Sequence, residues 1–214
     1  MATLTRERLI ETAIRLFGDN GVEATSLRTL TEAARTNIAA VNYHFGSKDG
    51  LLRAVIDQTM RPVNDERRHR LDALESAPEP PSVADLVRAF VEPGSELPES
   101  HGDNGPAVAR FIGRLVTEPD PAVRQLFADQ VDPVEGRYLT ALGHALPGLD
   151  DDAVRFAYTS MLGLLSLHQS GAFTALDWPH RLSPRTGRTA SADRERLITF
   201  ITAGILTTRD RSNA

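Results

Sequence analysis

The 214-residue sequence contains no cysteine, so disulfide bonds and thiolate metal sites are excluded. It also lacks paired histidines, a glycine-rich phosphate loop and a recognisable Ser-His-Asp order, and we expect no enzyme activity, metal or cofactor. The longest apolar run, MLGLLSL at 161–167, is too short to span a bilayer. The N-terminus has no continuous apolar core of the signal-peptide kind. We therefore expect a cytoplasmic protein without a membrane partner.

An excess of positive charge, which would favour nucleic-acid binding, is missing as well. The chain has 24 Lys and Arg against 29 Asp and Glu, a net charge of -5. The charge is uneven: residues 1–53 hold seven basic and six acidic residues (+1), which leaves -6 for the remainder. A less acidic N-terminal part on an acidic body fits a DNA-binding head joined to a regulatory body.

Apolar residues recur at helical spacing along almost the whole chain, and no stretch keeps the alternation of a strand. We predict an all-α, two-domain protein with a helix-turn-helix DNA-binding domain at 1–53 and a ligand-binding and dimerisation domain at 54–214. Prolines and glycines make 93–106 and 173–191 loops. The nine expected helices occupy residues 5–20, 27–35, 38–45, 48–75 (a connector), 82–92, 106–117, 120–145, 151–171 and 192–208.

Local signals set several helix ends. Thr5 is expected to cap the first helix, and Thr25 or Ser26 the second. Ser47 is expected to cap the connector helix, and Ser82 forms a capping box with Asp85.

Two short helices joined by a tight turn, with a third behind them, are typical of a helix-turn-helix. The helix at 38–45 is short enough for a major groove about 12 Å wide, with small residues for close approach and Ile38 and Val41 as core anchors. The start of the connector helix, with Lys48, can hold a phosphate. A packing role for Tyr43 and His44 against the connector is the alternative. The residues left for DNA are Ala39, Ala40, Asn42, Tyr43 and His44.

TAIRLFGDNGVEATS, followed by SLRTLTEAARTNIAAVNYHFGSKDGLLRAVI, resembles the DNA-binding head of TetR-family transcriptional regulators over residues 5–56. Members of that family usually have glycine where this chain has Arg35. If Arg35 is left-handed, arginine costs about 1 kcal/mol relative to glycine. Arg35 itself is either a surface residue or a phosphate contact. The resemblance implies DNA contacts or backbone caps at Thr25, Ser26, Arg28, Asn37, Ala39, Ala40, Asn42, Tyr43, His44 and Lys48.

The segments FIGRLVTEPDPAVRQLF, LPGL and MLGLLSLHQSGA are similar to the C-terminal domains of fatty-acid-responsive PsrA-type repressors in that family. Arg110 and Arg114 share a helix face with apolar residues, a combination that suits an amphipathic or fatty-acyl effector with an acidic head. Alternatively, Arg114 pairs with Glu118. The run ERRHR at 66–70 is interpreted as a solvated helix face. The candidate ligand-binding residues are Arg110, Phe111, Arg114, Leu115, Tyr158, Leu162 and Leu165, although a stripe like that around Tyr158 is more often core or dimer interface.

These observations predict a repressor that a small-molecule effector releases from a palindromic double-stranded DNA operator. One recognition helix buries too little surface for tight binding, so we expect a homodimer with half-sites ~34 Å apart. An all-α enzyme or small-molecule carrier, and a regulator that acts through a protein partner, are the alternatives. The resemblance places the dimer contact on the helices at 151–171 and 192–208, at Leu164, His168, Leu197, Ile198, Ile201, Gly204 and Ile205.

Overall fold

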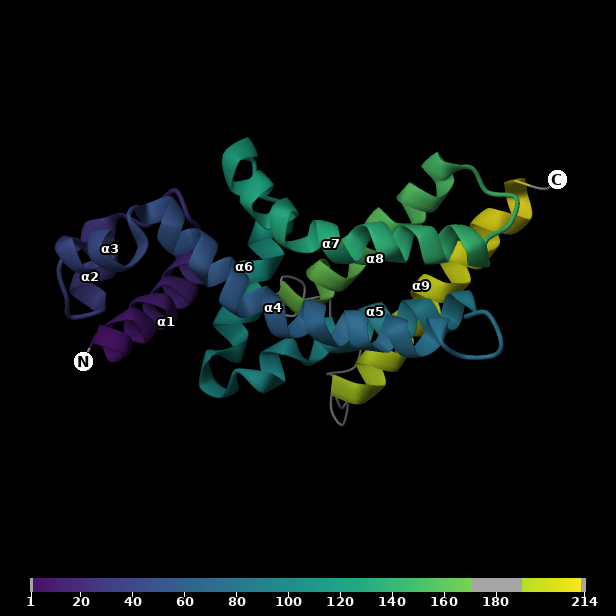
Figure 1. The fold of residues 1–214 in the computed structure, drawn as a ribbon, viewed down its shortest axis with the longest axis horizontal. Helices are drawn as coiled ribbons and strands as arrows, with labels where there is room; N and C mark the ends of the chain where they lie inside the picture. The colour runs from purple at the N-terminus through teal and green to yellow at the C-terminus, as the bar shows by residue number, and fades with distance from the viewer. Residues whose placement is uncertain (1, 171–189, 213–214) are drawn as a thin grey trace, which may run out of the picture. The chain divides into compact units, whose positions relative to one another are not determined.

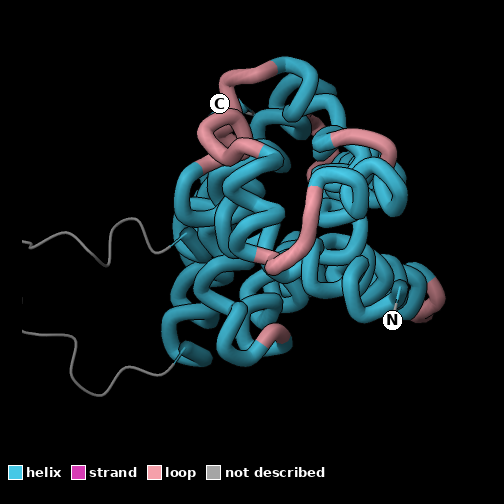
Figure 2. Tube along the Cα trace, turned by 90° about the vertical axis from the view of Figure 1, so that its left-hand side faces the viewer, coloured by secondary structure: helices cyan, strands magenta, loops and turns pink. Residues whose placement is uncertain are grey.

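The computed structural model describes residues 2–170 and 190–212. This part of the chain consists of helices and loops and contains no strand (Figures 1 and 2), which confirms the all-α prediction. A single 3-10 turn, η1, is the addition to the nine α-helices expected. The elements are α1 (Ala2–Asn20), α2 (Leu27–Ala33), α3 (Ile38–Phe45), α4 (Lys48–Glu75), α5 (Val83–Ser100), η1 (Gly102–Asn104), α6 (Gly105–Val116), α7 (Pro121–Ala145), α8 (Asp151–Ser170) and α9 (Ala190–Ser212).

The chain divides into two compact units, each with a hydrophobic cluster of its own. Unit 1 comprises residues 1–63 and 97–131, and unit 2 comprises residues 64–96 and 132–214. Unit 1 therefore holds α6 in addition to the three short helices and the start of α4. The predicted division at residue 53 separates functions rather than compact units and stays a prediction.

In unit 1, α1, α2 and α3 pack on one another, and α6 packs on α1 (Figure 1). The apolar stripe predicted for α1 is buried, and Phe17 stacks on Phe111 of α6 with ring centroids 6.1 Å apart. Gly18 permits this approach, because a Cβ atom there would lie 2.6 Å from the carbonyl oxygen of Ala107. The expected cap at Thr5 is wrong, since α1 already begins at Ala2.

The connector prediction is confirmed, because α4 runs from Lys48 to Glu75. Ser47 caps it by accepting a hydrogen bond from the Gly50 N–H at 3.0 Å. The capping box before α5 is also present: the Asp85 N–H donates to Ser82 Oγ at 3.2 Å, and the Ser82 N–H donates back to the Asp85 carboxylate at 3.0 Å.

The loop predicted at 93–106 is wrong in its first half, because α5 continues to Ser100. Proline at 98 removes the helical donor to the carbonyl oxygen of Gly94. The side chain of Gln169, from α8, donates a hydrogen bond to that carbonyl and replaces the missing donor. The loop predicted at 173–191 lies outside the described residues up to 189, and residues 190 and 191 belong to α9.

The core of unit 2 is built on an aromatic cluster. The ring of Phe90 on α5 meets Tyr138 of α7 and Tyr158 of α8 edge to face, with centroids 5.2 and 5.4 Å apart. The isoleucines of α9 pack into the same cluster. Edge-to-face rings of this kind add to the stabilisation that burial alone provides.

Candidate nucleic-acid interface and regulatory residues

The turn between α2 and α3 is built around a left-handed arginine. Ser26 is the N-cap of α2 and accepts from the Thr29 N–H at 3.0 Å. Arg35 follows the end of α2 with φ +50°, and it is the one non-glycine residue with positive φ in the described chain. The backbone condition anticipated for Arg35 is therefore met, at a cost of about 1 kcal/mol relative to glycine.

Helix α3 is fixed at both ends and on one face. Asn37 caps it, since its side-chain oxygen accepts from the Ala40 N–H at 3.0 Å. Gly46 ends it with φ +77°. Val41 is fully buried and anchors the helix, whereas Ile38 is 45% exposed, so the prediction of a core anchor at Ile38 is wrong.

The opposite face of α3 is presented to solvent. Tyr43 is 81% exposed, which excludes its packing against the connector helix. Ala39 and Asn42 are exposed, whereas His44 is partly buried and its ring meets that of Tyr43 edge to face at 4.9 Å. Lys48, also partly exposed, stands in the first turn of α4. An exposed aromatic hydroxyl, an amide, an imidazole and a cation next to a helix N-terminus are groups that bind phosphates and base edges.

Two of the implied DNA contacts have other partners. Thr25 is 1% exposed, and its hydroxyl donates to the carbonyl of Gly21 at 2.7 Å. This corrects the expectation for Thr25: its side chain supports the loop before α2 from inside. Arg28 is exposed and pairs with Glu32 at 2.9 Å, which raises the pKa of its guanidinium through hydrogen bonding and charge attraction. To bind a phosphate, Arg28 must exchange this partner.

Arg110 and Arg114 lie on α6 and contact the C-terminal end of α1. Arg114 donates to the carbonyl oxygens of Gly18 and Asp19 at 2.9 and 3.1 Å, and Arg110 pairs with the Asp19 carboxylate at 2.6 Å. Both arginines thus have partners on α1, the alternative Arg114–Glu118 pair does not form, and the role of either as an effector anchor stays a prediction. Both arginines attach α6 to α1.

The remaining candidate ligand-binding residues do not form one site. Phe111 and Leu115 are buried in the cluster of unit 1, against α1. Tyr158 and Leu165 are buried in the cluster of unit 2, and Leu162 packs against that cluster. Phe111 and Leu115 thus belong to the core of one unit and Tyr158 and Leu165 to the core of the other, and their role in ligand binding stays a prediction.

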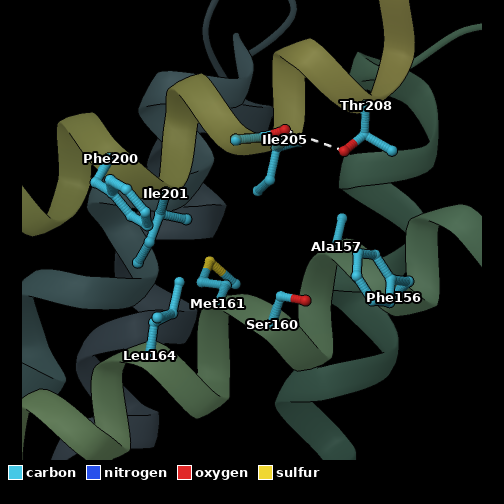
Figure 3. Close-up of a pocket in the computed structure, with 10 residues that line it drawn as sticks. Phe156, Ala157, Ser160, Met161, Leu164, Phe200, Ile201, Ile205 and Thr208 are labelled. Atoms are coloured by element: carbon cyan, nitrogen blue, oxygen red, sulfur yellow. Dashed lines mark hydrogen bonds between the residues drawn. The ribbon is translucent and has the colours of Figure 1, made fainter. Parts of the chain in front are cut away.

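The residues predicted for the dimer interface divide into two groups. Ile198, Ile201 and Ile205 are buried within one chain, where they pack α9 on α8, and their part in a dimer interface stays a prediction. Leu164 and Leu197 are partly buried, and His168 and Gly204 are exposed. Figure 3 shows Ile201 and Ile205 directed from α9 toward Met161 and Ala157 on α8.

Sequence reasoning missed the two phenylalanines of this surface. Phe156 on α8 is 64% exposed and Phe200 on α9 is 68% exposed. They border a pocket of about 250 Å³ between the two helices (Figure 3). Gly204 also lines this pocket. Large exposed aromatic side chains beside a hollow are typical of a surface that another molecule covers. The sequence could have indicated them, because each phenylalanine lies outside the apolar stripe of its helix, on the face that otherwise carries polar residues.

Two family models match the chain. The model of the bacterial regulatory proteins of the tetR family matches residues 9–55, and the model of the tetracyclin repressor-like C-terminal domain matches residues 88–204, more than half of the chain. The chain belongs to the TetR family. Within the described residues of this TetR-family chain, no helix is both long enough and apolar enough to cross a membrane.

Individual relatives are distant. The chain is 23% identical over 128 residues to a probable HTH-type transcriptional regulator, YttP of Bacillus subtilis, covering 60% of this chain and 58% of the relative. It is 39% identical over 58 residues to the nicotine-responsive transcriptional repressor HdnoR of Paenarthrobacter nicotinovorans, covering 27% and 30%. The chain thus spans less than two thirds of either relative. The structure of NalD, a repressor of a multidrug efflux pump in Pseudomonas aeruginosa, shares the fold with a TM-score of 0.62 at 20% identity, covering 95% of this chain and 98% of NalD.

Proposed function

We propose that this TetR-family chain is a DNA-binding transcriptional repressor that binds a palindromic double-stranded operator as a homodimer and is released by a small-molecule effector. The observation that carries the proposal is the construction of α3. Asn37 and Val41 fix the helix, while Tyr43 projects from its other face at 81% exposure. A rigid helix with an exposed polar and aromatic face is what major-groove binding requires.

The second copy is proposed to cover the α8–α9 surface. Phe156 and Phe200 are exposed beside Gly204, whose missing side chain permits close helix contact. Burying these rings against their symmetry mates would remove apolar surface from water, and the two-fold axis would present two copies of α3 to two half-sites.

An effector site in unit 2 completes the proposal. The relative HdnoR is described as nicotine-responsive, which supports a small-molecule effector without naming the one for this chain. An effector can shift the protein between DNA-bound and released forms only by its differential affinity for the two. Action on chromosomal DNA implies a cytoplasmic protein, and the fatty-acyl effector class stays a prediction.

The test is a footprint on the intergenic DNA upstream of the chain's own gene, combined with binding measured at several salt concentrations. We expect a protected palindrome and an affinity that falls steeply with salt. Lys48→Ala should lower the salt slope by about one unit, because one phosphate contact is lost. Arg196→Ala on α9, which removes the same charge from unit 2, should leave the slope unchanged. Absence of a footprint, or binding that salt does not affect, would contradict the proposal.

A further inference from the structure

One arginine of unit 2 is buried, although the two other arginines of the same run on α4 are partly exposed. Arg67 is 3% exposed, which contradicts the interpretation of residues 66–70 as a solvated face. Arg68 on the next position pairs with Asp65, and Arg70 pairs with Glu66 and Glu92. Arg67 forms no ion pair with a carboxylate of the described chain, so it is a buried cation without a counter-ion there.

The surroundings of Arg67 hold its guanidinium in place without neutralising it. Its Nε donates to the carbonyl oxygen of Phe90 at 3.0 Å, and the guanidinium carbon lies 3.7 Å from the centre of the Phe90 ring. Its two terminal nitrogens make no hydrogen bond to a described residue. Gly94 leaves room for one of them, since a Cβ atom there would lie 2.9 Å from Nη2. The fork that suits a carboxylate is therefore unused.

Burial of this charge is unfavourable by itself. Desolvation lowers the pKa of Arg67 to about 10, against an ordinary value of 12.5. The phenols of Tyr138 and Tyr158 cannot supply the missing negative charge, because burial raises the pKa of both. A ring face and one carbonyl repay only part of the cost of a desolvated cation. The described residues therefore do not neutralise this cation.

We propose that Arg67 is the anchor of the effector site, and that the effector is an organic carboxylate with an apolar body. The carboxylate pairs with the free edge of the guanidinium, and the apolar body replaces contacts within the aromatic cluster of Phe90, Tyr138 and Tyr158. The role of the bound molecule as effector rests on the proposed function. The binding step itself follows from the geometry of unit 2.

The test uses the full-length chain and a series of carboxylates that runs from acetate to decanoate and includes phenylacetate, each beside its primary amide. Thermal melting over a range of concentrations gives the dissociation constants. We expect at least one carboxylate to bind about tenfold more tightly than its amide, because the amide cannot neutralise the guanidinium. The straight-chain and aryl members distinguish an aliphatic from an aromatic body. Arg67→Met should abolish the preference for carboxylates.

Arg70→Met is the matched control. It removes the same group one turn along α4 from a cation that already has two carboxylate partners, so the preference should persist. If Arg67→Met fails to fold, Gly94→Ala decides. The added methyl group would lie 2.9 Å from both Arg67 Nη2 and Leu165 Cδ2, so Nη2 is displaced and carboxylate binding should weaken about tenfold. Equal binding of carboxylates and amides, no binding by any carboxylate, or a preference that survives at Arg67→Met or Gly94→Ala would overturn the proposal.

The same preparation is assayed for operator binding, which separates the two proposals. DNA binding without a carboxylate preference overturns the anion site and leaves the repressor function intact. A carboxylate preference that depends on Arg67, in a protein that binds no DNA, overturns the repressor function and leaves the anion site intact.

Discussion

Replacement of Arg114 by alanine tests whether α6 is attached to α1 in the way the structure indicates. The last four carbonyls of an α-helix have no donor within the helix. At the end of α1, the guanidinium of Arg114 supplies donors to two of them, those of Gly18 and Asp19, at 2.9 and 3.1 Å. Arg114→Ala should therefore loosen the end of α1 from α6 and lower the stability of unit 1.

The magnitude follows from the solvent exposure of the two bonds. A hydrogen bond from a charged donor contributes about 1.5–3 kcal/mol when it is buried. Here one bond is partly buried and the other is exposed, so water replaces the lost donor at the second carbonyl. We expect a loss of about 1–2 kcal/mol in the free energy of unfolding. Arg110→Ala, which removes a half-exposed pair with Asp19, should cost less than about 1 kcal/mol.

Amide hydrogen exchange of α1 is the appropriate measurement, because it reports local opening of unit 1 rather than unfolding of the whole chain. Arg124→Ala serves as the control. Its guanidinium also donates to two carbonyls, those of Glu118 and Pro119, but both lie in the segment just before its own helix. If exchange in α1 accelerates no more in Arg114→Ala than in Arg124→Ala, the attachment of α6 to α1 does not depend on this side chain.

Tyr43→Ala should weaken operator binding by about 1–3 kcal/mol in a gel-shift titration and change stability by less than ~0.5 kcal/mol, whereas Val41→Ala should lower the melting temperature through a loss of about 2 kcal/mol. Phe200→Glu should give folded monomers in sedimentation, while Ile201→Glu should also unfold the chain because Ile201 is buried. Burial raises the pKa of Glu92, but hydrogen bonds from two arginines outweigh it and leave the pKa lowered. The stability from Glu92 is then present above pH ~4.5 and lost as pH falls through its lower folded pKa, so acid unfolding should be less steep in Glu92→Gln.

The parts of the fold that depend on near neighbours were predictable from the sequence. The stripe along α1, the full length of α4 and the caps at Ser47 and Ser82 follow from spacing and from side chains within three or four residues of the atoms they contact. The left-handed conformation considered for Arg35 was predictable for the same reason, because a tight turn determines the dihedral angles of its own residues. The expected cap at Thr5 shows the limit of such rules, because α1 begins one turn earlier, at Ala2.

The parts that depend on distant partners were not predictable. Where α5 continues past Pro98, the missing helical donor is replaced by Gln169, which is 75 residues away from the carbonyl that it reaches. Arg114 contacts carbonyls 95 and 96 residues away, so the nearby Glu118 was the only partner visible in the sequence. The spacing of apolar residues does not indicate such long-range contacts. For the same reason, the apolar stripe of α9 did not show which of its residues pack within one chain and which are open to a second copy.

The arginines of this chain repeatedly donate to main-chain carbonyls, and the comparison among them isolates Arg67. Arg114 reaches carbonyls at the end of α1, and Arg124 reaches carbonyls in a connecting segment, so both satisfy oxygen atoms that no helix supplies with donors. The carbonyl of Phe90, which Arg67 reaches, lies inside α5, where the N–H of Gly94 is the regular helical donor. Arg67 is therefore not needed as a cap. Capping therefore does not explain why this cation is buried, and an external anion is the remaining partner of the right chemistry. For this reason Arg67, rather than Arg110 or Arg114, is the residue to mutate in a search for the effector.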